Sequence, residues 1–313
     1  MMASPYDGEV PRETSKHPLR ALIAIATYNR AAELEALLSS LDPQAAALGA
    51  DVVVVDNDAA GSARSIAEAS PVVTRYVIEP EPGIAQARNR GLDEFDERYD
   101  VIIFVDDDEI AHTDWLQQHL DYLQSSGSDI TLGAVYTEIP DDAPRWLREG
   151  GYLQRGIPPT GTVCPSAATN NTCVRRTAWI AAGSPRFNPA FSATGGSDTD
   201  FFQKLTERGL LIRFVAEAIV DEPTPATRLT RRWVARRMTR NGVVAGRVMA
   251  EREGRRAVVR YGFGEVRRGV RFVASDLRHR RPISATSSRT LLMGVGELYS
   301  VLGGRIYEYK RAK

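Results

Sequence analysis

The densest group of chemically active side chains in this sequence is a run of four carboxylates, Asp106 to Glu109. The run follows the apolar residues 102–105, which have the length of a buried strand. Neighbouring carboxylates at a strand end repel one another unless cations or hydrogen-bond donors compensate them. A divalent cation, Mg2+ or Mn2+, is the simplest compensation, because such ions prefer hard oxygen ligands. The alternative is a solvated acidic turn before a helix that starts near Thr113.

A second acidic cluster follows two glycines. Gly195 and Gly196 precede Ser197, Asp198 and Asp200, and apolar residues of helical spacing begin directly afterwards. In one interpretation Ser197 or Asp198 caps a helix and interacts favourably with its dipole. In the other, the glycines allow close approach of a ligand and an ionised Asp198 accepts a proton from a hydroxyl nucleophile. If both acids are helical, Asp200 projects about 200° around the helix from Asp198.

Polar residues also follow two earlier apolar runs and lie on one helix. Thr27, Tyr28 and Asn29 follow residues 21–26, and Asp56 follows residues 52–55. No glycine-rich turn follows the first run, which argues against a dinucleotide-dependent dehydrogenase. Each residue has two interpretations. Asn29 either caps a helix or contacts a ligand, and Asp56 either forms a turn or contacts a ligand. Arg88 either lies on the surface of its helix or makes a bidentate contact to phosphate or a base edge.

The remaining reactive side chains give no separate site. Cys164 and Cys173 are too few for a disulfide framework or a four-ligand metal site, and we expect free thiols. His112 and His119 are seven residues apart without metal-ligand spacing, so we interpret both as structural or surface residues. No G-x-S-x-G nucleophile elbow is present, which leaves acyl transfer without support.

Alternating strands and helices must position these groups. Each short apolar run is typical of a parallel strand covered on both faces, and such a sheet binds ligands at the carboxyl ends of its strands. Leu34, Leu37, Leu38 and Leu41 form one helical stripe, and we expect Pro43 to end that helix. The predicted strands are residues 21–26, 52–55, 75–78, 101–105 and 130–135. The first predicted helix contains the leucine stripe, and two more span residues 63–69 and 84–95. Further helices are predicted to begin near residues 113 and 201, and the tail over 229–313 is predicted to be helical.

Charge divides the chain into unlike parts. The protein has 313 residues with 40 basic and 40 acidic side chains, so bulk electrostatics argue against nucleic-acid binding. From residue 228 onward, however, 22 Lys or Arg stand against 6 Asp or Glu, giving +16, and residues 1–227 carry −16. We expect a flexible leader over 1–18, an α/β domain over 19–227 and a basic helical region over 228–313. No apolar stretch is long enough to span a membrane, which predicts a cytosolic protein.

The basic region has two interpretations. Helices with arginines on one side and apolar residues on the other suit docking on the anionic inner face of the cell membrane. Alternatively, the oppositely charged parts pack against each other or against a second subunit.

Taken in order, six segments of this chain resemble the inverting family 2 glycosyltransferases of the GT-A fold. The segments resemble in particular the branch of glucosyltransferases that act in succinoglycan-type exopolysaccharide assembly, and the likeness covers residues 19–230. The segments are IATYNR, VVVVDND, IEPEPGIAQARNRGL, FVDDDE, TNNTCVRR and GGSDTDFF.

The resemblance implies a reaction and a set of roles. A nucleoside diphosphate sugar, which we expect to be UDP-linked, would donate its sugar to an acceptor hydroxyl, for instance on a lipid-linked saccharide. Asp198 would be the general base, and Asp108 would bind the Mg2+ or Mn2+ ion that bridges the diphosphate. The nucleotide would be bound by Thr27, Tyr28, Asn29, Asp56, Arg88, Asp106 and Asp107. The sugar or acceptor would be contacted by Asn170, Asn171, Gly196 and Asp200.

Two departures from the family pattern matter. Ser197 stands where the family usually has Glu, which leaves open a non-catalytic scaffold that only binds sugar nucleotides. Leu229 stands where processive synthases have Gln, although Arg232 and Trp233 match their Arg-Trp pair, so we expect transfer of a single sugar. A sugar nucleotidyltransferase is disfavoured because the residues after the first strand lack a glycine-rich basic loop.

Overall fold

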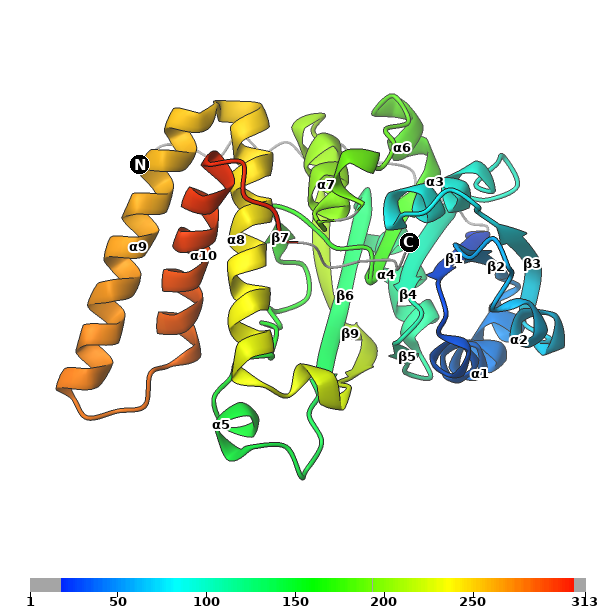
Figure 1. Ribbon diagram of the computed structural model, residues 1–313. Helices are drawn as coiled ribbons and strands as arrows, with labels where there is room; N and C mark the ends of the chain where they lie inside the picture. Colours follow the sequence, from blue (N-terminus) through cyan, green and yellow to red (C-terminus); the bar gives the residue numbers. More distant parts are fainter. Residues whose placement is uncertain (1–17, 193, 307–313) are drawn as a thin grey trace.

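The computed structural model describes residues 18–192 and 194–306. Residues 1–17 of the expected leader lie outside this range. The described chain forms one nine-stranded sheet in the order β3-β2-β1-β4-β8-β6-β9-β5, with β7 paired to β9 (Figure 1). The strands are β1 (Ala21–Thr27), β2 (Asp51–Asp56), β3 (Val73–Ile78), β4 (Val101–Asp106), β5 (Ile110–Ala111), β6 (Ile130–Glu138), β7 (Val163–Cys164), β8 (Asn171–Arg175) and β9 (Ile212–Pro223).

The first four strands of the sheet are parallel, as their continuous apolar runs predict. Their register aligns the carboxyl ends of the strands. Thr27 of β1 pairs with Asp56 of β2, and Ala26 of β1 pairs with Asp106 of β4, the other neighbour of β1. Three polar strand ends that are far apart in the sequence therefore meet at one edge of the sheet.

The other part of the sheet is mixed, and its pairing was not predicted. Strand β8 runs antiparallel between β4 and β6, and β9 is parallel to β6 but antiparallel to β5 and β7. Local sequence pattern gave no indication of β8 or β9, because their pairing partners lie far away along the chain. The predicted α/β fold class, a mostly parallel sheet with flanking helices, is confirmed, and β8 is inserted into it.

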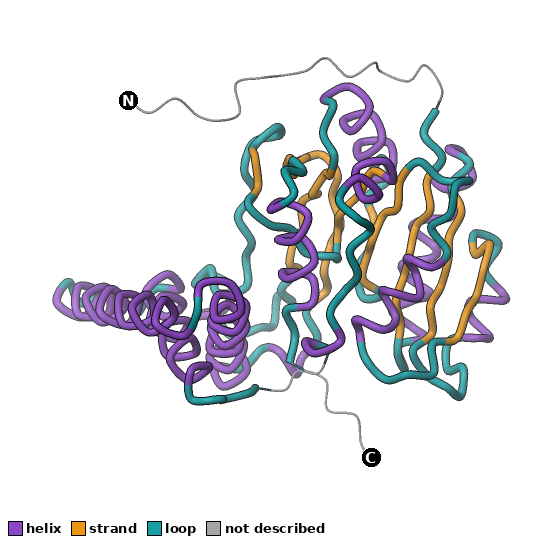
Figure 2. Tube along the Cα trace, turned by 90° about the horizontal axis from the view of Figure 1, so that it is seen from above, coloured by secondary structure: helices purple, strands orange, loops and turns teal. Residues whose placement is uncertain are grey.

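Helices cover both faces of the sheet (Figure 2). Alternate side chains of each parallel strand enter two different cores, one packed against α1, α2 and α4 and the other against α3, α6 and α7. The helices are α1 (Ala31–Leu48), α2 (Arg64–Ala69), α3 (Ile84–Asp93), α4 (Trp115–Ser126), α5 (Arg145–Arg148), α6 (Arg176–Ala181), α7 (Ser197–Glu207), α8 (Arg231–Glu253), α9 (Arg255–Arg278) and α10 (Ala285–Val301).

The prediction that Pro43 ends the first helix is wrong. Helix α1 continues through Pro43 and ends before Gly49, which adopts a left-handed φ of 63°. Proline removes one backbone donor and normally costs a helix interior about 3 kcal/mol. Here Leu41 and Ala45 on either side are buried in the core, and the Gln44 amide donates hydrogen bonds to the Ser40 and His112 carbonyl oxygens. Burial of this helix face compensates for the proline, and the Gln44 side chain connects the helix to the segment at His112.

The basic C-terminal region forms three packed helices beside the α/β domain (Figure 1). Helix α10 lies between α8 and α9, and glycines let the backbones approach: a Cβ on Gly269 would lie 2.5 Å from Leu291 of α10. Arg252 of α8 forms an ion pair with Glu207 of α7, so the basic region partly neutralises the acidic domain. Among the described residues, no helix combines the length and apolar character needed to cross a bilayer.

A buried carboxyl in these helices makes their stability depend on pH. Glu297 is 2% exposed, its Cα and Cβ lie against Gly246 and Gly262, and its Oε2 accepts no hydrogen bond from the described chain. Burial raises the pKa of Glu297 from 4.5 to about 7, and Arg268 opposes the shift. The folded state thus holds this proton more tightly than the unfolded state, so stability is lost as pH rises from about 4.5 through 7.

We expect Glu297→Gln to increase the free energy of unfolding at pH 8 by roughly 1–3 kcal/mol, and to change it little near pH 5. Urea unfolding across this pH range measures the difference, with Glu253→Gln as an exposed control on α8. An equal effect of Glu297→Gln at both pH values would contradict the assignment.

Candidate active site

A cleft of about 400 Å3 opens where the carboxyl edge of the sheet meets helix α8. Six arginines and four carboxylates line it, so its wall is strongly charged and carries a small cationic excess. The acids are Asp106, Asp108, Asp198 and Glu222, and the arginines are Arg30, Arg88, Arg155, Arg228, Arg237 and Arg240.

The four consecutive acids after β4 point in different directions. Asp106 and Asp108 line the cleft, and Asp106 accepts a hydrogen bond from Arg88 at 3.1 Å. Asp107 is buried and pairs with Arg30 at 2.9 Å, and Asp108 pairs with the same guanidinium at 2.9 Å. The acidic run is therefore not a solvated turn, because arginines compensate three of its four carboxylates.

Burial perturbs three members of this run, and it raises the pKa of Asp106 although Arg88 opposes the shift. It raises the pKa of Asp107 to about 6, although Arg30 opposes the shift. It raises the pKa of Glu109 well above the usual range, and repulsion from Asp106 adds to the effect. Glu109 accepts hydrogen bonds from the Asp106 backbone N–H at 3.1 Å and from the Asn170 amide at 3.0 Å. Glu109 thereby links the acidic turn to the segment before β8.

A network of basic residues on the far side of the cleft was not predicted. Glu222, at the end of β9, lies between Arg155 at 2.7 Å and Arg228 at 3.3 Å. Arg228 also reaches Asp108 at 3.4 Å. Arg155, Glu222 and Arg228 come from three separate segments of the chain, and local sequence pattern gave no indication that they meet. Trp233 also lines the cleft, with the Arg228 and Arg237 guanidiniums 5.7 and 5.2 Å from its ring centre.

The glycine pair and the second acidic cluster lie at the start of α7, where it meets α8. Gly196 has a φ of 102°, and a Cβ there would lie 2.5 Å from Val244 of α8, so glycine is required for both conformation and space. Asp198 in the first turn of α7 lines the cleft. Asp200 is buried and pairs with Lys204 at 2.5 Å instead. The helical geometry thus separates the two acids, as their spacing predicts.

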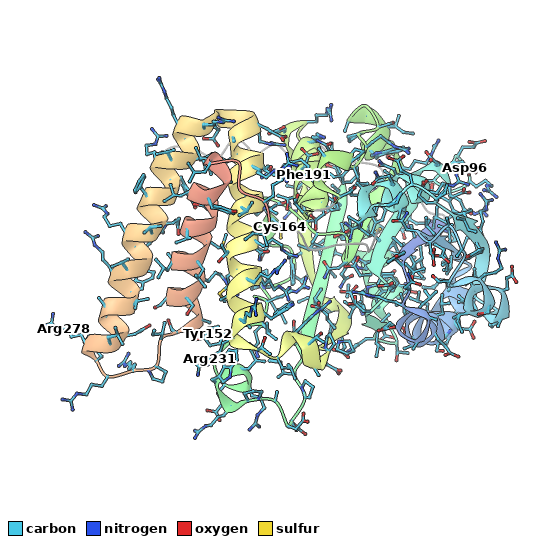
Figure 3. All side chains as sticks on the ribbon, viewed as in Figure 1. Asp96, Tyr152, Cys164, Phe191, Arg231 and Arg278 are labelled. Carbon is cyan, nitrogen blue, oxygen red and sulfur yellow. The ribbon has the colours of Figure 1, made fainter. Side chains whose placement is uncertain are left out.

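Helix α8 is held against this region by side chains as well as by shape. Arg247 donates a hydrogen bond to the Thr194 hydroxyl, and its guanidinium lies 4.7 Å from the ring centre of Phe191, which Figure 3 labels. The basic region therefore forms one side of the cleft rather than a separate appendage.

The residues at the ends of β1 and β2 do not line the cleft, and their side chains have separate surroundings. Asp56 is fully buried and accepts hydrogen bonds from the Ala63 N–H at 2.7 Å and the Tyr76 hydroxyl at 2.8 Å. Asn29 does not cap α1, whose N-cap is Arg30, and it takes a left-handed φ of 53°. Thr27 is buried and pairs with Asp56 across the sheet, while Tyr28 is exposed.

The two consecutive asparagines have different surroundings. Asn170 lines the cleft. Asn171 lies inside the sheet, where its Oδ1 accepts from Trp115 at 2.8 Å and from His119 at 2.7 Å, and its amide donates to two backbone carbonyls. Burial lowers the pKa of His119 to about 4, so this histidine is neutral and structural, as expected. Asn171 holds strands together and does not face the cleft.

The cysteines fit the expectation of free thiols. Cys173 is buried in β8, and burial raises the pKa of its thiol to about 12, so it is a poor nucleophile.

The cleft acids fit a hard divalent cation that is shared with a ligand. Within residues 18–192 and 194–306, no three His, Cys, Asp or Glu side chains gather into a metal-binding group. Mg2+, however, is typically bound by one or two carboxylates together with substrate phosphates. Asp106 and Asp108 present that number of carboxylates to the cleft, beside arginines suited to phosphate oxygens.

A mostly parallel sheet with helices on both faces, and a charged cleft at its carboxyl edge, define a GT-A-like glycosyltransferase fold. Residues 22–179 match the model of glycosyl transferase family 2. The chain is 36% identical over 256 residues to the succinoglycan biosynthesis protein ExoM of Rhizobium meliloti (strain 1021), covering 78% of each chain. The chain belongs to the family 2 glycosyltransferases and is an enzyme of that family.

Solved structures share the fold at low sequence identity. A crystal structure of residues 1–349 of S. aureus TarS matches with a TM-score of 0.53 at 13% identity, covering 91% of this chain and 92% of that one. Another TarS structure matches with a TM-score of 0.52 at 15% identity, and there the similarity spans 43% of the TarS chain. GalNAc-T7, crystallised with UDP, GalNAc and Mn2+, matches with a TM-score of 0.53 at 15% identity over 67% of this chain and 45% of its own.

Proposed function

We propose that this enzyme transfers one sugar from a UDP-sugar to an acceptor hydroxyl with inversion at the anomeric carbon. The observation that carries the proposal is the placement of Asp198 in the same cleft as Asp106 and Asp108. A proton acceptor and a diphosphate-binding group are both needed for this reaction, and they must face one space. The arginines around them supply the positive charge that a diphosphate requires.

Asp198 acts as the general base. Its carboxylate takes the proton of the acceptor hydroxyl while the oxygen attacks the anomeric carbon from the face opposite the leaving group. The new C–O bond forms as the bond from the anomeric carbon to the diphosphate breaks, and the electron pair leaves with the diphosphate. Asp198 is half-buried, so its carboxylate is shielded yet reachable by an acceptor.

The donor nucleotide occupies the strand ends. Thr27, Tyr28, Asn29 and Asp56 border the base, Asp106 and Asp107 the ribose, and Arg88 the base or diphosphate. Arg30 and Arg228, which both contact Asp108, are placed to stabilise negative charge on the departing diphosphate. Asn170 and Gly196 border the sugar or acceptor. Asn171 and Asp200 are left out of this proposal, because the Asn171 side chain bonds within the sheet and Asp200 pairs with Lys204.

Asp108, with Asp106 nearby, would hold the Mg2+ or Mn2+ ion. A bound ion supplies Lewis-acid stabilisation of the leaving diphosphate. The GT-A-like neighbour GalNAc-T7 was crystallised with Mn2+ and UDP, which supports this assignment.

The acceptor is a lipid-linked saccharide in exopolysaccharide synthesis, and the enzyme acts at the cytoplasmic face of the cell membrane. The similarity to the succinoglycan biosynthesis protein ExoM over 78% of both chains supports this pathway class. Single-sugar transfer follows from Leu229 in place of the Gln of processive synthases. The proposed domain division places the transferase domain at 19–227 and the basic region at 228–313, with α8 completing the site.

The direct test incubates the purified protein with UDP-, GDP- and dTDP-sugars and with Mn2+ or Mg2+, and measures the nucleoside diphosphate released. We expect metal-dependent release from a UDP-sugar. If UDP binds in the presence of metal but no donor is cleaved, with or without lipid-linked acceptors, the protein is a sugar-nucleotide-binding scaffold, and Ser197 marks the loss of activity.

A further inference from the structure

Helix α9 carries an apolar stripe that no other element of the described chain covers. Phe263, Val270 and Leu277 are 63%, 52% and 61% exposed. They follow one another at seven-residue intervals, so they lie along one side of the helix with a drift of about 20° per step. Val266 and Val273 fall between them at helical spacing and are partly buried. The stripe extends along most of a helix about 36 Å long.

The seam between α9 and α10 does not use these side chains. Gly262 and Gly269 face Leu298 and Leu291 of α10 at contact distance, which defines the packed side of α9. The exposed stripe is turned away from that seam. Helix α10 adds the exposed apolar side chains of Val295 and Tyr299 to the same helical layer, and Leu302 follows directly after the helix.

A row of arginines runs beside the apolar stripe. Arg256, Arg260, Arg267, Arg271 and Arg278 are all exposed, and their spacing of four and seven residues places them on one side of α9. By helical geometry the row lies about 70° around the axis from the stripe. Helix α9 has seven arginines and two acids. Figure 1 places this helix at the outer edge of the molecule, and Figure 3 labels Arg278 at its end.

We infer that this side of α9, the α9 docking face, binds the surface of an anionic lipid bilayer. Its members are Phe263, Val270 and Leu277 together with the row Arg256, Arg260, Arg267, Arg271 and Arg278. An apolar stripe bordered by arginines matches the interface of such a bilayer, where apolar side chains enter the acyl boundary and guanidiniums contact lipid phosphates.

The charge distribution favours a bilayer over the other occupants. A second copy packed antiparallel by twofold symmetry would place the same arginine row against itself, and a parallel copy would bring both rows into one interface, where like charges are unfavourable. A nucleic acid would engage the arginines but leave large apolar side chains without a partner. Only an anionic surface with an apolar interior satisfies both features.

The biological role of the α9 docking face depends on the proposed function, because bilayer binding would bring a lipid-linked acceptor close to the cleft. Helix α10 packs against α9 on one side and against α8 on the other, and α8 lines the cleft. A bilayer bound by α9 would thus lie about two helix spacings, or roughly 20 Å, from the cleft. A lipid-linked acceptor held in that bilayer would be presented near the donor site.

Flotation of the full-length protein with phosphatidylcholine vesicles, with and without phosphatidylglycerol, tests the inference. We expect binding that requires phosphatidylglycerol and falls at high salt. The combined variant Phe263→Ser, Val270→Ser and Leu277→Ser should weaken binding at least about tenfold. The variant Arg260→Gln, Arg267→Gln and Arg271→Gln should weaken it by about fivefold for each arginine removed.

A matched control removes exposed apolar side chains elsewhere: Tyr136→Ser, Val163→Ser and Ile180→Ser. This variant should bind vesicles like the parent, and thermal unfolding verifies that all three variants fold. Failure of the parent to bind anionic vesicles, or unchanged binding by the α9 variants, would overturn the inference. Light scattering that shows a parent dimer converted to monomer by the serine variant would assign the face to self-association instead. Donor cleavage measured without lipid reports separately on the proposed function.

Discussion

Replacing Asp198 with Asn is expected to lower the turnover number by at least about 10²- to 10⁴-fold, the usual contribution of a general base. Asn cannot accept the proton of the acceptor hydroxyl, yet it has nearly the same size as Asp. Asp198 lies at the wall of the cleft, and its Oδ1 also accepts a hydrogen bond from the Thr199 N–H at 2.8 Å. Binding of UDP, measured by titration calorimetry, should remain near normal, because the substitution affects the acceptor side.

The matched control is Asp200→Asn in the same helical turn. Asp200 forms a buried ion pair with Lys204, so its substitution should lower thermal stability but leave turnover within a few-fold of the parent. If Asp198→Asn keeps full activity and Asp200→Asn loses it, the base is Asp200, and α7 must rearrange on substrate binding. Loss of turnover in neither variant would remove both acids from the role.

Replacing Asp108 with Ala is expected to abolish the effect of Mn2+ or Mg2+ on UDP binding and to lower turnover by roughly 10²- to 10⁴-fold, because several kcal/mol of leaving-group stabilisation are lost. Asp108 is the member of the acidic run that contacts two cleft arginines, Arg30 and Arg228. Its loss removes a hard oxygen ligand from the position nearest these phosphate-binding groups. Calorimetric titration of UDP with and without metal measures the first effect, and release of nucleoside diphosphate measures the second.

Asp108→Asn serves as the companion that keeps the size of the side chain, and it should reproduce the loss. Asp141→Ala removes an exposed carboxylate outside the cleft and should change neither measurement. Metal-stimulated UDP binding that persists in Asp108→Ala would show that Asp108 is not the metal ligand. If the parent itself binds UDP and cleaves donor equally well without metal, the arginines alone neutralise the diphosphate.

Part of this architecture follows from local sequence. Continuous apolar runs at the first four strands predict buried parallel strands, because polar side chains cannot enter a sheet covered on both faces. The polar residues that end those runs, Thr27, Asp56 and Asp106, therefore had to collect at one edge of the sheet. The helical period after Gly196 likewise predicts that Asp198 and Asp200 project to different sides of the helix. These properties depend on strand and helix periodicity, which neighbouring residues determine.

Residues 18–192 and 194–306 also contain features that only tertiary packing decided. Strands β8 and β9 find their partners across long stretches of chain, so local pattern did not reveal them. Asn170 and Asn171 look equivalent in the sequence, yet one lines the cleft and the other closes a buried network with Trp115 and His119. Pro43 continues a helix because burial of its neighbours Leu41 and Ala45 in the core compensates for the missing backbone donor.

The sequence by itself determined the fold class, the family and the acids at the strand ends. The tertiary structure decided that basic helix α8 forms one wall of the cleft, and that Arg228 connects Asp108 to Glu222. The physical reason is that periodicity is set within a few residues, whereas the partners of a long charged side chain are set by which distant segments pack together. Electrostatic compensation of the acidic run could therefore be expected, but the arginines that provide it could be identified only in the folded chain.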